Sequence, residues 1–240
     1  MTRKKTLDII ILLGCDKVIG ISVAESHEWE ETLKRFNKKH EECLKSPFGE
    51  YFEIVIDNKN IVLFRSNVRK VASSACCQYM IDKYKLKKVI VIGTCAGVDQ
   101  RFKQYDIVIP NKVVQYDCTV RETEPLIKEK FNVDIDLSNL KFDYNSGILG
   151  TADKPLVMWN DYLILKDNNI TVVDTEAAGI AYVCKMNNVD ILIIKGISDF
   201  PTNENNSSKE ISHQEQYELF LKNIPIVMNK IFDNYLNKVL

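Results

Sequence analysis

Long apolar runs are missing from this chain of 240 residues. No stretch approaches the ~20 consecutive apolar residues that a membrane-spanning helix needs. The apolar run at 9–13 is short and follows the charged flank M-T-R-K-K-T-L-D, whereas a secretory signal needs a longer apolar core and a small-residue cleavage site. We therefore expect a cytoplasmic protein that does not associate with a membrane.

Metal-ligand patterns are missing as well. The seven cysteines are odd in number and scattered, no C-x-x-C pair exists, and the three histidines, His27, His40 and His213, lie far apart. These spacings give poor support for a zinc site. We expect no metal and no cofactor, and we expect most of the cysteines to be small, reduced residues of the core.

An excess of charge of either sign is the third absence. The formal net charge is -1, which leaves no electrostatic footprint for a nucleic acid or for an anionic membrane surface. A hydrophobic content of 45% with 27% charged residues is that of an ordinary soluble globular protein. The length suits one large α/β domain over residues 1–240, with two small domains as the alternative.

The chain does have a series of short apolar runs, rich in β-branched residues, that alternate with helix-like stretches. We expect strands at 7–13, 18–24, 51–56, 61–65, 88–92, 106–114, 171–173 and 190–195. We expect helices at 25–44, 68–84, 175–186 and 211–236, the last broken near Pro225. The turn-forming D-N-K-N after residue 56 predicts a β-hairpin. Together these patterns predict an α/β fold of three layers, in which helices flank a mixed, largely parallel central sheet.

One strand end carries a glycine-rich turn. The stretch V-I-V-I-G-T-C-A-G-V (89–98) is a buried strand that runs into Gly93 and Thr94. Its glycines let the backbone approach a ligand closely and offer amide donors, and sites in open α/β sheets gather at the carboxyl ends of strands. The turn is neither a dinucleotide-binding motif nor a Walker loop, and a tight strand–helix turn is the alternative.

Two further strand ends bring carboxylates. V-V-D-T-E-A-A-G (172–179) opens a helix-like segment with an acidic pair, and a buried carboxylate needs a partner, either a side chain or a ligand hydroxyl. I-L-I-I-K-G-I-S-D-F-P (191–201) ends a strand with Ser198 and Asp199. Desolvation at such a place can raise the pKa of a carboxyl group and suit it to general acid catalysis. A helix cap or a turn is the alternative role for this aspartate.

These segments, in this order, resemble the nucleoside phosphorylase/nucleosidase superfamily, and within it the methylthioadenosine/S-adenosylhomocysteine nucleosidases. G-T-C-A-G-V-D (93–99) resembles the family's glycine-rich turn, D-T-E-A-A-G (174–179) its E-x-E-[AG]-A-like helix start, and I-S-D-F (197–200) its strand ending in S-D. The resemblance runs from about Val18 to at least Phe200. It implies hydrolysis of the bond between base and ribose in an adenosine-type nucleoside, such as methylthioadenosine or S-adenosylhomocysteine.

The resemblance also implies roles for individual residues. It implies that Glu176 accepts hydrogen bonds from the ribose hydroxyls and that Asp199 donates a proton to the purine N7, oriented by Ser198. Glu28 falls on a glutamate that the family carries after its first strand, within V-I-G-I-S-V-A-E-S-H-E-W (18–29), and would take a proton from water. If 7–13 were the first strand instead, Glu28 would lie on a solvated helix face. The remaining substrate-binding candidates are Gly93, Thr94, Thr175 and Phe200.

Departures from the family's pattern leave two alternatives open. Hexameric phosphorylases carry an arginine three residues before the serine or threonine of the glycine turn, where this chain has Val91, so Arg69 or Arg65 would have to anchor phosphate. Pro155 stands where the nucleosidases usually place an aromatic that stacks on the base, and 67–69 replaces a glycine-containing turn. A nucleoside-binding module without turnover is therefore the third hypothesis. The resemblance further implies a homo-oligomer, with a dimer favoured.

Overall fold

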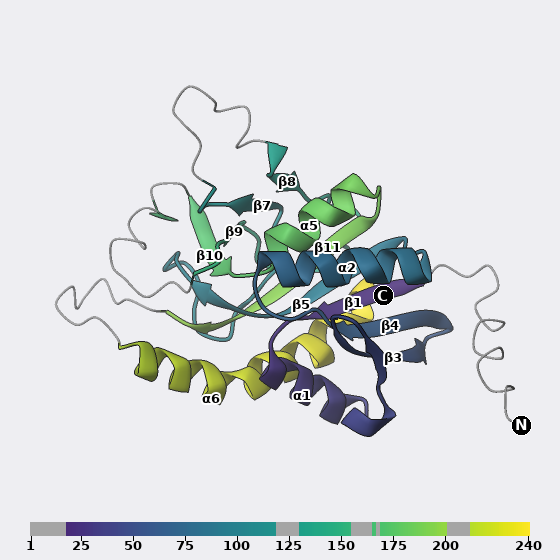
Figure 1. Ribbon diagram of the computed structural model, residues 1–240. Helices are drawn as coiled ribbons and strands as arrows, with labels where there is room; N and C mark the ends of the chain where they lie inside the picture. Colours follow the sequence, from purple (N-terminus) through teal and green to yellow (C-terminus); the bar gives the residue numbers. More distant parts are fainter. Residues whose placement is uncertain (1–17, 119–129, 155–164, 167–168, 201–211) are drawn as a thin grey trace, which may run out of the picture.

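The computed structural model describes residues 18–118, 130–154, 165–166, 169–200 and 212–240 (Figure 1). The strand expected at 7–13 lies outside these residues. The strands are β1 (Ile19–Val23), β2 (Leu44–Ser46), β3 (Gly49–Ile56), β4 (Lys59–Arg65), β5 (Lys88–Gly97), β6 (Ile107–Val108), β7 (Lys112–Gln115), β8 (Val133–Asp134), β9 (Ile148–Thr151), β10 (Ile170–Asp174) and β11 (Asp190–Asp199). The helices are α1 (Ser26–Arg35), α2 (Lys70–Tyr84), α5 (Ala177–Met186), α6 (His213–Ile231) and α7 (Asn237–Val239), with a 3-10 turn at His40–Glu42 and a π-helical turn at Phe232–Leu236.

The described strands form one mixed sheet in the order β2-β3-β4-β1-β5-β10-β9-β7-β8, with β11 beside β5 and β6 beside β11. Its centre is parallel, because β1 pairs with both β4 and β5, and β5 pairs with β11. Antiparallel pairs lie further out, including the expected hairpin of β3 and β4. The expected α/β fold, with helices flanking a mixed sheet, is confirmed.

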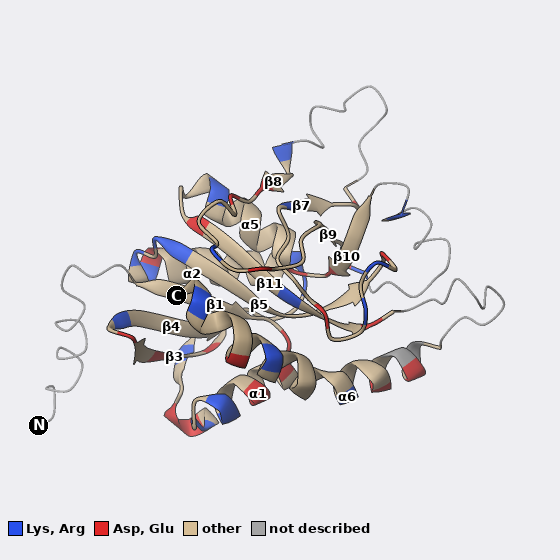
Figure 2. Cartoon of the chain, turned by 180° about the vertical axis from the view of Figure 1, so that it is seen from behind, with Lys and Arg blue, Asp and Glu red and all other residues tan. Residues whose placement is uncertain are grey.

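Alternation along the central strands gives each face of the sheet its own apolar core. Val62, Phe64, Val89 and Val91 pack with α2 and α5, whereas Ile61, Leu63, Ile90 and Ile92 pack with α1 and α6. Figure 1 shows these two helix pairs on opposite faces of the sheet, and Figure 2 shows charged residues mainly on helices and loops, with the central strands largely tan. Full burial of a valine, leucine, isoleucine or phenylalanine side chain contributes about 1.5–3 kcal/mol to the free energy of folding.

The prediction of one helix over 25–44 is wrong. α1 ends at Arg35, Asn37 takes the left-handed conformation with φ of +49°, and the chain then forms the 3-10 turn and β2. A left-handed residue ends a helix, and asparagine adopts that conformation more easily than most residues do. The strand expected at 106–114 is two strands, β6 and β7, with Pro110 between them, because proline cannot donate to a strand ladder.

The prediction of a break near Pro225 is also wrong, because α6 continues through this proline from His213 to Ile231. Ile224 and Val227, on either side of it, are fully buried in the core beneath α1 and α6. Packing of this apolar face outweighs the backbone hydrogen bond that proline cannot make. Within the ranges given above, none of the helices combines the length and the apolar character needed to cross a bilayer.

Candidate active site

A cavity of about 390 Å³ opens where the central strands end. β1 stays beside β5 as far as the pair Val23 and Ile92, and beyond this point Ala96 and Gly97 of β5 pair with β10 instead. Such an exchange of neighbours at the carboxyl ends of strands is where α/β sheets commonly bind ligands. Residues of α1, β5, β10, β11, α6 and the entry to α2 line the cavity.

Glu28 reaches the cavity from the first turn of α1. The helix begins with a capping box, in which the Glu25 carboxylate accepts from the Glu28 amide and Glu28 Oε2 accepts from the Glu25 amide. Glu28 Oε1 also accepts from the amide and the hydroxyl of Thr94, at 2.6 and 2.7 Å. The side chain is almost fully buried, and this burial raises its pKa, although Lys195 and Thr94 act in the opposite direction.

Gly93 makes room for this carboxylate. Its φ is +150°, a conformation that side-chain-bearing residues rarely adopt, and a Cβ there would lie 2.8 and 2.9 Å from the two Glu28 oxygens. The glycine of the strand-end turn is therefore needed for the close approach of a carboxylate of the same chain. The sequence instead predicts that Gly93 lets the backbone approach a ligand closely.

Asp174 and Glu176, the acidic pair at the start of α5, have different partners. Asp174 has protein partners: it accepts from the Thr151 hydroxyl at 2.6 Å and from the amide of Ala177, the first residue of α5, at 3.1 Å. Glu176 lines the cavity, where its Oε1 accepts from the Arg69 amide at 3.0 Å and from the Thr175 hydroxyl. Burial and the neighbouring Asp174 raise the pKa of Glu176 to about 7.

Lys195 is a buried charged residue of the site that the sequence pattern did not predict. Its side chain is 2% exposed in β11, and its Nζ lies 3.0 Å from Asp174 Oδ2. Burial alone would lower the pKa of Lys195, but Asp174, Glu28 and Glu176 outweigh this effect and raise it. A single lysine inside the apolar strand I-L-I-I-K-G-I was the available signal, because an unpaired buried ammonium is costly and implies acidic neighbours.

Asp199 stands at the end of the same strand. The register of β11 against β5 shifts between Ile197 and Asp199, so a bulge redirects the strand end. Ser198 Oγ lies 2.5 Å from Asp199 Oδ1 and 3.1 Å from the Cys95 carbonyl oxygen. The Ser198 carbonyl accepts from Asn223 Nδ2 at 2.7 Å, which ties the strand end to α6.

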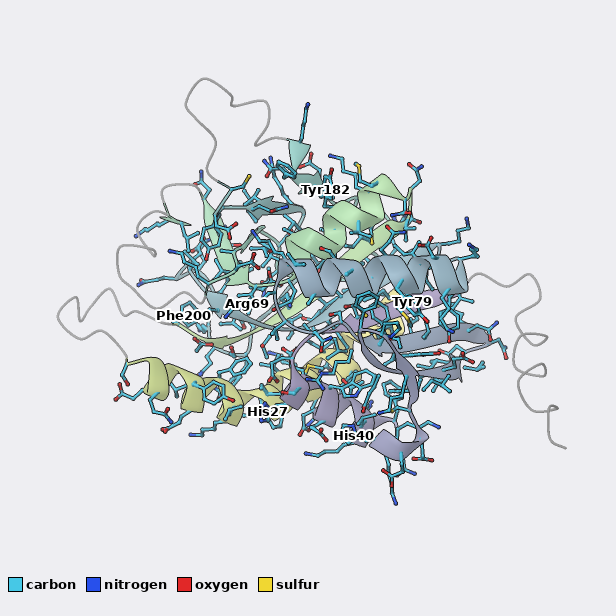
Figure 3. All side chains as sticks on the ribbon, viewed as in Figure 1. His27, His40, Arg69, Tyr79, Tyr182 and Phe200 are labelled. Atoms are coloured by element: carbon cyan, nitrogen blue, oxygen red, sulfur yellow. The ribbon has the colours of Figure 1, made fainter. Side chains whose placement is uncertain are left out.

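The structure brings six of the predicted site residues to the cavity: Glu28, Thr94, Thr175, Glu176, Ser198 and Asp199. Phe200 does not line it among the described residues. The Phe200 ring instead packs over Gly97, where an added Cβ would lie 2.3 Å from Phe200 Cε1. Figure 3 shows Phe200 on the same side of the molecule as Arg69, a cavity residue. Val91 lies in the core with α2 and α5, 2% exposed.

The family model of the Phosphorylase superfamily matches residues 9–233. This chain belongs to the Phosphorylase superfamily. The chain is 30% identical over 182 residues to the 5'-methylthioadenosine/S-adenosylhomocysteine nucleosidase of Buchnera aphidicola subsp. Baizongia pistaciae, and the match covers 69% of each chain. The Bacillus cereus protein of the same name is 26% identical over 205 residues, which is 78% of this chain and 89% of that protein.

Solved structures share the fold of this superfamily member. The 5'-methylthioadenosine nucleosidase of Arabidopsis thaliana superposes with a TM-score of 0.77 at 18% identity, covering 93% of this chain and 95% of that one. The futalosine hydrolase of Helicobacter pylori superposes with a TM-score of 0.69, also at 18% identity, covering 90% and 97%. At this level of identity both comparisons establish the fold alone.

Proposed function

We propose that this member of the Phosphorylase superfamily is a purine nucleosidase. Its substrate is an adenosine-type nucleoside such as 5'-methylthioadenosine or S-adenosylhomocysteine, and it hydrolyses the N-glycosidic bond. The observation that carries the proposal is the convergence of three buried carboxyl groups, Glu28, Glu176 and Asp199, from three separate elements on one cavity. The relatives that bear the names of nucleosidases for these two compounds support it.

Asp199 acts as the general acid in this proposal. It gives a proton to N7 of the purine while the bond between C1' and N9 breaks and its electrons pass to the base. Ser198 Oγ, at 2.5 Å, orients the carboxyl group. General acid catalysis of this kind contributes ~10²–10⁴-fold, or roughly 3–5 kcal/mol of barrier.

Glu28 acts as the general base. It takes a proton from water while the water oxygen bonds to C1' of the sugar, and its two contacts from Thr94 hold the carboxylate in place. A pKa raised by burial brings a glutamate closer to the neutral range in which a base works well. Glu176 accepts hydrogen bonds from the ribose hydroxyls in its ionised form, since charge-assisted hydrogen bonds are stronger than neutral ones.

The charge of the site favours water over phosphate as the nucleophile. Asp174, Glu28 and Glu176 are buried around one ammonium, that of Lys195, so carboxylates outnumber cations there. Cleavage of a glycosidic bond passes through a cation-like sugar, which this surplus of negative charge stabilises. These carboxylates would repel a phosphate dianion, and Lys195 is already paired with Asp174 at 3.0 Å, so burial of phosphate would cost several kcal/mol unless another cation held it.

Phosphorolysis is the second candidate, and one observation favours it. Arg69 lines the cavity, and its Nη1 is buried without a hydrogen-bond partner in the part of the chain that the structure describes. A guanidinium suits phosphate because it donates two parallel hydrogen bonds to an anion. The buried Val91 gives no help, because it packs in the apolar core.

We propose a single domain over residues 1–240 that acts as a homodimer in the cytoplasm, without nucleic-acid or membrane partners. Val68 and Val71, which are 46% and 79% exposed at the start of α2, offer an apolar surface beside the cavity for a second copy. The six described cysteines are free, as in a reducing compartment. A monomeric mass by light scattering would remove the dimer from the proposal.

Release of the base tests the function. Adenine or hypoxanthine would be measured from a panel of purine nucleosides with wild type, with Asp199→Asn and with Asp190→Asn, an exposed control at the other end of β11. We expect Asp190→Asn to match wild type and Asp199→Asn to be slower by at least ~10²-fold. Near-full activity of Asp199→Asn would refute its role as the acid. If wild type released no base from any purine nucleoside, a binding module without turnover would replace the enzyme.

A further inference from the structure

Lys70, the first residue of α2, joins three segments at the edge of the cavity. Its Nζ lies 2.6 Å from Asp117 Oδ1 and 3.8 Å from Asp153 Oδ2, and its amide donates to Asp153 Oδ1 at 2.9 Å. The Asp153 amide in turn donates to Asp117 Oδ2 at 2.9 Å. The start of α2, the segment after β7 and the segment after β9 thus form one closed network, in which the Lys70 side chain is 15% exposed.

The immediate neighbours of this network belong to the cavity. Arg69 precedes Lys70, and its amide holds Glu176 at 3.0 Å, while Lys154 follows Asp153 and lines the cavity. Arg69 has φ of +78°, a strained conformation for a residue with a side chain, which persists only when its surroundings impose it. Figure 3 shows Arg69 at one end of α2, with Tyr79 further along the helix.

α5 supports the same turn of α2 as well. A Cβ added to Gly179 of α5 would lie 2.9 Å from the Lys70 carbonyl oxygen and 3.3 Å from Lys70 Cα, so the two helices touch backbone to backbone. The first turn of α2 is therefore held both by α5 and by the network of Lys70. The backbone of Arg69, which bonds Glu176, has little freedom while both supports are present.

We infer that Lys70 is a positioning residue for the sugar side of the site. This inference rests on the proposed function. Lys70 acts through Arg69 and Glu176. Asp199 and Glu28 stand on β11 and α1, outside the network. A group that supports contacts made equally in the ground state and the transition state affects KM and leaves kcat nearly unchanged. Lys70 therefore serves capture of the nucleoside, and the acid and the base do not depend on it.

The test replaces Lys70 by methionine, which keeps the length of the stem and removes the charge. We expect Lys70→Met to raise KM for the nucleoside about 10-fold while kcat changes by less than about 3-fold. Lys70→Arg, which keeps the charge, should recover part of the loss. Asp117→Asn should raise KM in the same way, and the double variant should add little to either single change because both break one network. Lys34→Met, which removes a single exposed ion pair with Glu31 on α1, is the control and should behave as wild type.

Binding measured without turnover completes the design. In the Asp199→Asn background, Lys70→Met should weaken binding of 5'-methylthioadenosine by the same ~10-fold in calorimetry. Equal KM in wild type and Lys70→Met would overturn the inference, and so would equal losses in KM and kcat that Lys70→Arg does not relieve. Absence of turnover in the wild type would instead refute the proposed function, so the two failures can be told apart.

Discussion

Replacement of Lys195 by methionine should destabilise the fold strongly. The change removes the ammonium that faces Asp174 at 3.0 Å and leaves this carboxylate buried, with the Thr151 hydroxyl and the Ala177 amide as close donors among the described residues. Removal of one partner of a buried ion pair costs about 3–5 kcal/mol, because the other charge stays uncompensated. With a urea dependence of about 3 kcal/mol per molar, the unfolding midpoint should fall by about 1–2 M.

The same variant should also change the pH dependence of the reaction. Lys195 lowers the pKa of both Glu28 and Glu176, so its loss raises both. Because the two groups act as carboxylates, the acidic limb of kcat/KM should move to higher pH. Lys195→Arg keeps the charge and should retain the wild-type limb.

A double variant separates charge from packing. Asp174→Asn together with Lys195→Met removes both charges, keeps a side-chain oxygen that can accept from the Ala177 amide, and should recover most of the stability that Lys195→Met loses. An unchanged urea midpoint and an unchanged acidic limb in Lys195→Met would refute the electrostatic account of this cluster.

Two further predictions concern the glycine turn and the ribose-binding carboxylate. Gly93 has a φ of +150°, and Gly93→Ala would place a methyl group against the Glu28 carboxylate. We expect kcat to fall by about 10²-fold while binding of the base is kept. An active Gly93→Ala would show that Glu28 need not approach Thr94. The pKa of Glu176 is raised from 4.5 to about 7, so wild-type kcat/KM should rise with pH through about 7. Glu176→Gln should lose this limb of the pH profile. The same variant should also lose the preference for ribosides over 2',3'-dideoxynucleosides. The folded state favours the protonated form of Glu176, so the contribution of Glu176 to stability should decline as pH rises from 4.5 to about 7. In Glu176→Gln this contribution should stay constant. Urea titration of both proteins at several pH values checks the difference.

Residue pattern alone predicted the parallel strands at the centre of the sheet, but it missed the short strands β2, β8 and β9. Ser198 and Asp199, and the pair Asp174 and Glu176, could be placed because they directly follow apolar runs whose carboxyl ends meet at one edge. Local pattern failed where tertiary contacts decide. The end of α1 depends on the left-handed Asn37, and the continuity of α6 depends on packing around Pro225.

The partner of Lys195 could not be found from sequence either. Asp174 precedes it by 21 positions on another strand, and only the folding of β10 and β11 beside β5 brings the two charges to 3.0 Å. The network of Lys70 is of the same kind, because Asp117 and Asp153 follow strands that are distant from α2 in the chain. Buried charges in apolar strands are therefore the signal to look for, while the identity of their partners needs the fold.

The sugar product formed in the presence of phosphate tests the central claim most directly. Wild type would be incubated with 5'-methylthioadenosine in millimolar phosphate, and the sugar would be identified by NMR. The surplus of buried carboxylates around Lys195 predicts adenine and free 5-methylthioribose, formed at a rate that phosphate does not increase. Formation of 5-methylthioribose 1-phosphate would contradict the account, because it would mean that phosphate enters this acidic cavity, with Arg69 as its anchor.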